Sequence, residues 1–513
     1  IVGGGIISSD PETAMEALEY ADYGVIGEGE ITNCELCKAL ENGEDVSCVD
    51  GLVYKNGEQH LITAPRKEIE DIDSIPWPDY EGFEFDKLLD AAPSMNGMNE
   101  KNTVFMLTSR SCPYSCTFCF HPVGKKYRQR SLDGFFAELD YMVQRYKVKY
   151  LYIADELFGY NMERVKEFCR RIKKYNISWW AQFRVDDVNP ELLEAIKDGG
   201  CAVMGFGLES ADNRILKSMR KHTTIEQIEH ALNLVYNAGI SFNGLFIFGD
   251  IEETAETANN TIQWWCNHKE YEISLAFIIT YPGTYLYKYA CEKGVIKDKV
   301  KFLKDGCPHI NVSRLSDEEM TALARQVIEL PRLHCYELVN PEFYAVDYRM
   351  AKVNIKGTCA KCGEINEWRD SKLFMRNHLD CVRCSQKHSV PCPPMFKRNI
   401  EINIQKLLEN NGKYAIWGIT EYIYDFIKRS DVFNNDNIFL IDISKLKQGV
   451  TLQGRIISDP DVIHREDMET VIISSPIYLR AIKDQIASDY KKVKNIYSIY
   501  DLVEPVLKHG SLT

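Results

Sequence analysis

The chain has 513 residues, of which 45% are hydrophobic and 11% aromatic, so it can form several packed cores. Its formal net charge of −14 excludes binding to nucleic acid through bulk electrostatics. No apolar run approaches the ~18 residues of a membrane-spanning helix, and the start does not resemble a signal peptide. The 17 cysteines are odd in number and partly clustered, which favours metal or cluster binding in a reducing, cytoplasmic compartment over a secreted disulfide framework.

The first segment, residues 1–64, has the pattern of the second half of an α/β domain. A strand end, Ile1-Val2, runs into the glycine turn Gly3-Gly4-Gly5, where backbone can approach a ligand closely. A domain rarely starts inside a strand, so we expect further residues before Ile1. Residues 65–100 contain four prolines and are predicted to form a linker.

Residues 101–345 alternate between short apolar strands and amphipathic helices. Six βα units in sequence predict a parallel sheet, open or closed into a barrel. The predicted strands are residues 104–108, 150–153, 179–183, 202–207, 242–248 and 273–280.

A C-x3-C-x2-C motif of Cys112, Cys116 and Cys119 follows the first of these strands. Loops at the C-terminal ends of strands form the functional face of βα barrels. Three closely spaced thiolates can bind one 4Fe–4S cluster, and the missing fourth cysteine leaves one iron open to a ligand. A zinc knuckle or chance spacing is the alternative.

The motif and the strand ends after it resemble the radical S-adenosylmethionine (SAM) superfamily over residues 104–330. The resemblance implies a partial (β/α)6 TIM-like barrel in which the open iron binds the amino and carboxylate groups of SAM. It also implies that Phe118 lies near the adenine, that Asp155 and Glu156 meet the amino group, that Arg184 meets the carboxylate, and that Glu209 and Ser210 touch the ribose and carboxylate. A surface salt bridge or a helix cap is the alternative for each strand-end residue. Leu245 replaces a glycine usual in the family, and we assign no ligand contact in the loop that follows.

The N-terminal segment and the linker resemble the radical SAM subgroup that carries a cobalamin-binding domain before the barrel. This resemblance implies that Gly3, Gly4 and Gly5 contact cobalamin at the edge of a doubly wound sheet. The chain departs from the subgroup at Ile6-Ile7, where a histidine is frequent. A degenerate domain that binds no cofactor is the alternative.

Residues 355–395 contain two C-x2-C knuckles, formed by Cys359, Cys362, Cys381 and Cys384 with 18 residues between them. This spacing is typical of a zinc ribbon, and a second iron–sulfur cluster is the alternative. Residues 405–513 return to βα alternation and predict a small Rossmann-like domain. Gly418 and Asp442 occupy positions loosely typical of nucleotide binding, but the full glycine motif is missing, so a packing or partner-docking domain is the other interpretation.

Together these patterns predict a cobalamin-dependent radical SAM enzyme, a methyltransferase acting at an unactivated carbon of a small molecule. One alternative is a radical rearrangement, cyclisation or oxidation without methyl transfer, and another is a nucleic-acid-modifying enzyme whose ribbon binds RNA. The expected cofactors are a 4Fe–4S cluster, SAM, cobalamin and zinc. The expected partners are a small-molecule substrate and a reductase, flavodoxin or ferredoxin that donates electrons under anaerobic conditions. Neither a membrane nor a nucleic acid is an expected partner, and no catalytic residue is assigned beyond the cluster ligands.

Overall fold

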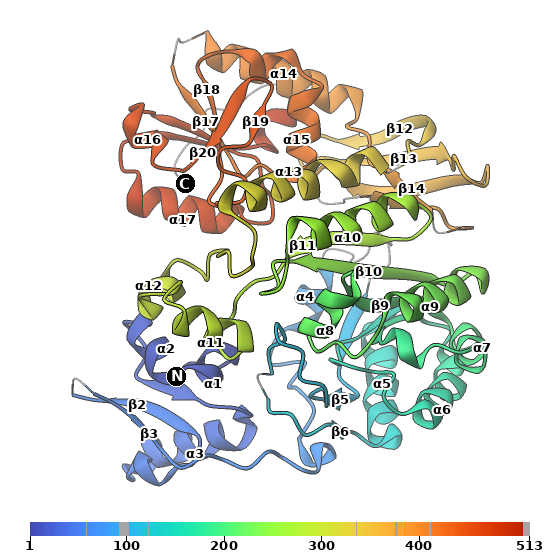
Figure 1. Cartoon of the computed structure of the whole chain (residues 1–513), viewed down its shortest axis with the longest axis vertical. Coiled ribbons are helices and arrows are strands. Elements are labelled where there is room, and N and C mark those ends of the chain that lie inside the picture. Colours follow the sequence, from blue (N-terminus) through green and yellow to red (C-terminus); the bar gives the residue numbers. More distant parts are fainter. Residues whose placement is uncertain are drawn as a thin grey trace. The chain divides into compact units, whose positions relative to one another are not determined.

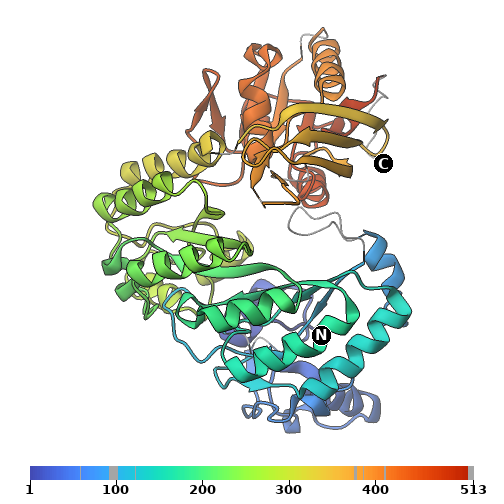
Figure 2. The same cartoon turned by 90° about the vertical axis from the view of Figure 1, so that its right-hand side faces the viewer.

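The computed structural model describes residues 1–57, 59–91, 102–121, 123–334, 336–374, 378–384, 386–409 and 412–505. They form two compact units, one holding the described residues up to Glu319 and the other those from Met320 onward. Figures 1 and 2 show the chain in two views, coloured along the sequence. Within the described residues, no helix combines the length and the apolar character needed to cross a membrane.

The first unit is built on a parallel sheet of six strands in the order β11-β10-β9-β8-β7-β4. The strands are β4 Thr103–Met106, β7 Tyr150–Ile153, β8 Ser178–Phe183, β9 Cys201–Glu209, β10 Ser241–Phe248 and β11 Ile273–Phe277. Each new strand joins the same edge of the sheet, as successive right-handed βα units do. Among the described residues β4 and β11 are its edges, so the sheet is open. This confirms the predicted α/β class with a partial (β/α)6 barrel.

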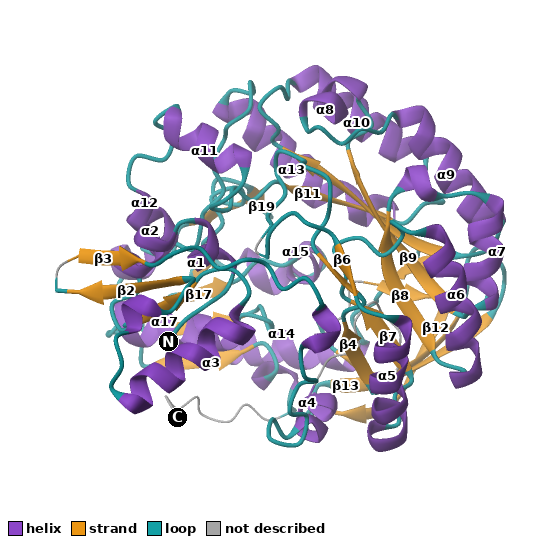
Figure 3. Ribbon diagram, turned by 90° about the horizontal axis from the view of Figure 1, so that it is seen from below, coloured by secondary structure: helices purple, strands orange, loops and turns teal. Residues whose placement is uncertain are grey.

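Helices connect these strands, and Figure 3 shows α5, α6, α7 and α9 along one face of the sheet. Helix α5 shows why they form: Ser131 caps its start by accepting a hydrogen bond from Gly134 N–H, and Phe135, Leu139 and Met142 are buried at helical spacing. Burying each such side chain contributes about 1.5–3 kcal/mol. The helices between the strands are α5 Leu132–Tyr146, α6 Met162–Ile172, α7 Pro190–Asp198, α8 Asn213–Ser218, α9 Ile225–Asn237 and α10 Ala255–Asn267, and α11 Tyr285–Glu292 and α12 Lys299–Lys304 follow the last strand.

The N-terminal segment belongs to the same unit. It contains α1 Gly5–Ser9, α2 Pro11–Ala17, β1 Tyr23–Val25, α3 Gly29–Asn42, β2 Leu52–Asn56 and β3 Gln59–Ile62, and α4 Phe85–Ala91 lies in the linker. The three strands pair antiparallel, whereas Val2 makes a parallel bridge to Gly24. Leu303 of α12 packs against the small core around Ile7 and Met15, so the start of the chain shares a core with the end of the barrel.

The second unit joins two small antiparallel sheets and a mostly parallel one. The cysteine-rich part contains β12 Val339–Asp347, β13 Lys352–Thr358, β14 Ile365–Lys372, β15 His378–Asp380 and β16 Lys387–Ser389, and it follows α13 Asp317–His334. The tail has the sheet order β19-β20-β18-β17-β21-β22, in which β17 Tyr414–Trp417 pairs parallel with β18 Ile438–Ile441 and β21 Thr470–Ile473. The remaining elements are α14 Pro394–Leu408, α15 Glu421–Lys428, β19 Thr451–Leu452, β20 Arg455–Ser458, α16 Val462–Arg465, α17 Leu479–Asp489 and β22 Asn495–Ser498.

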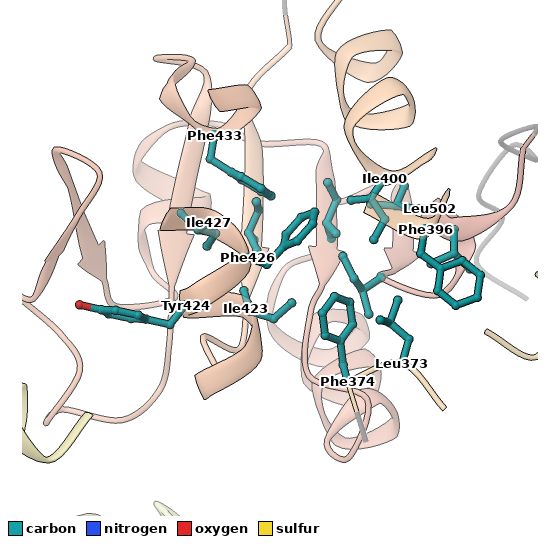
Figure 4. Packing of buried hydrophobic residues seen from close by; sticks show 14 of the residues in the cluster. Leu373, Phe374, Phe396, Ile400, Ile423, Tyr424, Phe426, Ile427, Phe433 and Leu502 are labelled. Atoms are coloured by element: carbon teal, nitrogen blue, oxygen red, sulfur yellow. The ribbon is translucent and has the colours of Figure 1, made fainter. Parts of the chain in front are cut away.

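One hydrophobic core spans both parts of this second unit. Leu373 and Phe374, directly after β14, lie in the same buried cluster as Phe396 of α14, Phe426 of α15 and Leu502 (Figure 4). The cysteine-rich part is therefore packed against the parallel sheet of the tail rather than attached by a free linker.

Candidate active site

The three motif cysteines lie in a loop that two short strands close. Strands β5 Ser109–Arg110 and β6 Arg128–Gln129 pair antiparallel, which sets Arg110 opposite Arg128. We call residues 109–129 the cluster hairpin. Thr117 N–H donates to the carbonyl of Met219 at 3.1 Å, and its own carbonyl accepts from Leu286 N–H at 3.3 Å. These bonds hold the hairpin against the segments that follow β9 and β11, at the C-terminal edge of the sheet.

The thiols of the cluster hairpin are partly buried. Burial raises the pKa of all three, that of Cys119 to about 12. Thiolates at these positions therefore need a compensating positive charge, which bound iron supplies. The donor set fits an iron–sulfur cluster.

A buried ion pair lies beside Cys116. Lys221 Nζ is 2.7 Å from Glu209 Oε1, and both side chains are almost fully buried. Burial is the main cause that raises the pKa of Cys116, while the charges of Lys221 and Arg184 lower it and that of Glu209 raises it. Glu209 ends β9 with a φ of 67°, a conformation that costs an ordinary residue energy and is often found at functional sites.

Arg184 follows β8 and is held by its own neighbours. It donates to both carboxylate oxygens of Asp186 at 2.9 and 3.1 Å and to the carbonyl of Lys221 at 2.9 Å. Its guanidinium also lies 3.8 Å from the ring centroid of Tyr114 in the cluster hairpin. Arg184 therefore fixes Tyr114 and Lys221 in place, and its charge is already compensated by Asp186.

The two acidic residues after β7 have different surroundings. Asp155 accepts four hydrogen bonds of 2.5–3.0 Å from the backbone and hydroxyl groups of Thr108 and Ser109, which occupy both of its oxygens. Glu156 keeps a buried carboxylate oxygen without a hydrogen-bond partner among the described residues, and this oxygen is 3.6 Å from Nδ1 of His121. Of the two, Glu156 has the acceptor that remains available for an ammonium group.

Of the other two residues predicted to contact SAM, Phe118 has surroundings that suit a ligand, whereas Ser210 is hydrogen-bonded within the protein. Phe118 packs against the apolar cluster of Ile215, Met219, Ile247, Ile278 and Leu286, a surrounding that suits a flat adenine ring. Ser210 is buried, lies 3.0 Å from the Thr261 hydroxyl and accepts a hydrogen bond from Asp212 N–H. Its hydroxyl is thus committed to the protein.

Of the three N-terminal glycines, Gly5 lies against the cluster hairpin. Gly4 has a φ of 106°, and a Cβ on Gly5 would overlap the ring of Phe120. The need for glycine at position 5 therefore comes from close approach to the cluster hairpin. A Cβ on Gly4 would meet open space, whereas one on Gly3 would lie 3.9 Å from Val25.

A cavity of about 730 Å³ opens beside the cluster hairpin. Cys116 and Cys119 line it from the hairpin, Ser9 and Asp10 from the N-terminal segment, and Thr284 from the loop before α11. Its size lies within the range of small-molecule sites. The N-terminal segment and the motif cysteines thus share one cavity.

Sequence reasoning missed two residues of this site, Lys221 and His121. His121 lines the cavity, and its two ring nitrogens have no hydrogen-bond partner among the described residues. Lys221 follows α8 in a polar stretch, where nothing distinguishes it from a surface lysine. In the sequence, the one feature that could have indicated His121 was its position two residues after Cys119.

The four cysteines of the second unit form a group of their own. Their sulfur atoms all lie within 4.8 Å of one another, with 3.6 Å between Cys359 and Cys384 and between Cys362 and Cys381. Tetrahedral Zn–S bonds of about 2.3 Å place the sulfurs about 3.8 Å apart. A cubic cluster separates its thiolates more widely, because each one binds a different iron. The geometry therefore fits a single ion better than a second cluster.

Comparison with known proteins identifies the first unit. Residues 106–264 match the family model of the Radical SAM superfamily. The chain carries a radical SAM domain, which confirms the family expected from the cysteine motif and the strand ends.

Two relatives and one solved structure are also similar to this chain. An uncharacterized methyltransferase of Pyrococcus horikoshii is 34% identical over 58% of this chain and 64% of its own length. An anaerobic magnesium-protoporphyrin IX monomethyl ester cyclase of Rubrivivax gelatinosus is 30% identical over 49% of this chain and 45% of its own length. The chain thus spans less than two thirds of these relatives. Among solved structures, the radical SAM methyltransferase TsrM of Kitasatospora setae aligns with a TM-score of 0.46 at 20% identity, covering 57% of each chain.

Proposed function

We propose that this chain catalyses a cobalamin-dependent radical SAM methyl transfer to an unactivated carbon of a small molecule. The observation that carries the proposal is the shared cavity, which Cys116 and Cys119 line together with Ser9 and Asp10 of the N-terminal segment. A reaction that uses two carriers needs both to reach one substrate. The resemblance of the N-terminal segment and the linker to the cobalamin subgroup supports the second carrier.

In this proposal the chain's own residues bind and orient. Cys112, Cys116 and Cys119 hold the cluster, which when bound supplies the electron that cleaves SAM, while cobalamin carries the methyl group. The free carboxylate oxygen of Glu156 accepts from the amino group of SAM. In the ion pair, the ammonium of Lys221 is available to the carboxylate of SAM and the carboxylate of Glu209 to the ribose hydroxyls of SAM.

The remaining predicted contacts have supporting roles here. Asp155 and Ser210 hold neighbouring loops, Arg184 positions Lys221, and Phe118 packs beside the adenine. Gly3 and Gly4 are proposed to face cobalamin. The burial of Glu209 and Lys221 keeps water from their charges, which strengthens their interactions with a bound ligand.

The names of two relatives support methyl transfer. Besides the Pyrococcus methyltransferase, a cytidylyl-2-hydroxyethylphosphonate methyltransferase of Streptomyces wedmorensis is 27% identical over 44% of this chain. The name of the second relative supports a small-molecule substrate. The rival, a radical ring closure without methyl transfer, is favoured by the Rubrivivax cyclase.

The test uses the complete protein, reconstituted anaerobically with iron, sulfide and hydroxocobalamin. Incubation with SAM, titanium(III) citrate and candidate small molecules is expected to release 5′-deoxyadenosine and S-adenosylhomocysteine and to add one methyl group to the product. The matched control replaces all three motif cysteines by alanine and is expected to release no 5′-deoxyadenosine. If cobalamin binds but only 5′-deoxyadenosine appears, the rival is correct. If cobalamin does not bind, methyl transfer is excluded.

We further propose that Cys359, Cys362, Cys381 and Cys384 hold one structural zinc ion. Asn366 supports the assignment, because its side-chain N–H donates to Cys381 Sγ at 3.6 Å and its carbonyl oxygen accepts from Val382 N–H at 2.8 Å. Such hydrogen bonds orient metal ligands. With four protein thiolates no coordination position remains for a substrate, so the ion would stabilise the fold.

A further inference from the structure

Glu28 of the N-terminal segment reaches into the base of the cluster hairpin. It precedes α3, and its carboxylate does not cap that helix. Instead Oε1 accepts from Arg110 Nη1 at 2.6 Å, while Oε2 accepts from Arg128 Nη1 at 2.7 Å and from Ile69 N–H at 2.7 Å. One buried carboxylate therefore joins both strands of the hairpin to the linker.

The base of the hairpin needs this negative charge. Arg110 and Arg128 face each other across the antiparallel pair, and like charges in that position repel. Arg128 is only 5% exposed, and its other hydrogen bonds reach neutral oxygens such as the carbonyls of Ile69 and Val123. A second carboxylate lies near each arginine, Glu68 at 3.7 Å from Arg128 and Glu30 at 2.5 Å from Arg110, but of these three carboxylates Glu28 alone contacts both. Burial by itself raises the pKa of Glu28, but hydrogen bonds from Arg128, Arg110 and Ile69 hold it below its ordinary value. Glu28 is therefore ionised and compensates charge that water cannot reach.

Through Arg128, the contact extends to both ends of the cysteine loop. Arg128 Nη2 donates to the carbonyl of Val123 at 3.0 Å and lies 3.5 Å from the hydroxyl of Ser111. Ser111 directly precedes Cys112 and has a φ of 68°, a conformation that its surroundings must stabilise. Val123 follows Cys119 by four positions. The three cysteines thus lie between two residues that Arg128 contacts, and Glu28 compensates the charge of Arg128.

We propose that Glu28 is a positioning residue for the cluster: it sets the base of the cluster hairpin from the N-terminal segment. The 4Fe–4S site of the barrel then depends on a residue 84 positions before its first ligand. This inference deepens the proposed function and rests on it only through the presence of a cluster on the three motif cysteines.

The test compares Glu28→Gln with the unaltered protein, both reconstituted with iron and sulfide and given SAM and dithionite. Glutamine keeps the size and removes the charge. We expect 5′-deoxyadenosine formation per bound cluster to fall by about tenfold to a hundredfold, because a small misplacement of a reacting group has that effect. The electron paramagnetic resonance (EPR) spectrum of the reduced cluster with SAM is expected to change as well. A second variant, Arg128→Lys, keeps the charge but loses the fork that reaches several acceptors, and the same changes are expected.

The matched control is Glu19→Gln, which removes an exposed ion pair between the N-terminal segment and Lys304 of α12, away from the hairpin. It is expected to keep the spectrum and the rate. A lower unfolding temperature of Glu28→Gln with an unchanged spectrum and rate per cluster would overturn the proposal, since a merely structural role predicts that result. If Glu28→Gln does not fold, Arg128→Lys decides: unchanged behaviour overturns the proposal. Absence of any cluster in the unaltered protein would instead refute the proposed function.

Discussion

Gly207 offers a way to disturb the candidate SAM site without changing any charge. It lies in β9, two residues before Glu209. A Cβ at this position would overlap Oε1 of Glu209 and lie 2.9 Å from Nζ of Lys221. Both atoms are at the ends of flexible side chains, so they can rotate away while the backbone stays. Gly207→Ala should therefore displace the buried ion pair and leave the sheet intact.

The expected effects of Gly207→Ala on the free energy of unfolding and on the affinity for SAM have different causes. The free energy of unfolding should fall by less than the about 3–5 kcal/mol that removing one partner of a buried ion pair costs, because both charges remain and the strand conformation suits alanine. Binding of SAM should weaken by about 1–3 kcal/mol, the range for polar ligand groups left without partners. This corresponds to a rise in Kd of about 5- to 150-fold.

Anaerobic calorimetry with the cluster-loaded protein measures the Kd, and chemical unfolding measures the stability. Gly29→Ala is the matched control, because its Cβ would meet Val25 Cγ1 at an ordinary 3.5 Å. This control should leave both quantities unchanged. A Kd for Gly207→Ala within twofold of the unaltered protein would show that the pair of Glu209 and Lys221 does not contact SAM.

Three further predictions concern metal content and pH. Replacing all three motif cysteines by alanine should abolish the four-iron absorption spectrum, and a spectrum that persists would refute the ligand assignment. The same triple variant should keep one zinc ion per chain by elemental analysis, whereas additional loss of Cys381 and Cys384 should remove it; iron in place of zinc would favour an auxiliary cluster. Burial lowers the pKa of His309 to about 4, so the folded state binds fewer protons than the unfolded one between about pH 4 and pH 6.5. The free energy of unfolding should therefore be unaffected by His309 above pH 6.5 and fall by up to about 3 kcal/mol toward pH 4. In His309→Leu this dependence of the free energy on pH, measured by urea unfolding, should become flatter.

The cysteine motifs could be interpreted from the sequence because their ligands are neighbours in the chain. Cys112, Cys116 and Cys119 need only a short loop after a strand, and that loop is local information. The strands could be predicted for a similar reason, because an apolar run is local information. The predicted bounds of β7 agree with the structure, and those of β9 differ by one or two residues at each end.

The role of each charged residue could not be predicted in this way. Asp155 and Glu156 are adjacent in the chain, yet one spends its oxygens on Thr108 and Ser109 while the other keeps one free. Which of two carboxylates remains available depends on the loops that surround it. The sequence suggested a pair with one shared role, and the structure separates them.

The amino-acid sequence alone determined the α/β class, the six parallel strands of the first unit and the two clusters of cysteines, because these follow from periodicity and spacing within a few residues. Only the tertiary structure decided that Lys221 pairs with Glu209 and that Glu28 meets Arg128, 100 positions away. The physical reason is burial. A charge in the interior is stable only beside its partner, and the partner is whichever residue the packing of distant segments brings there.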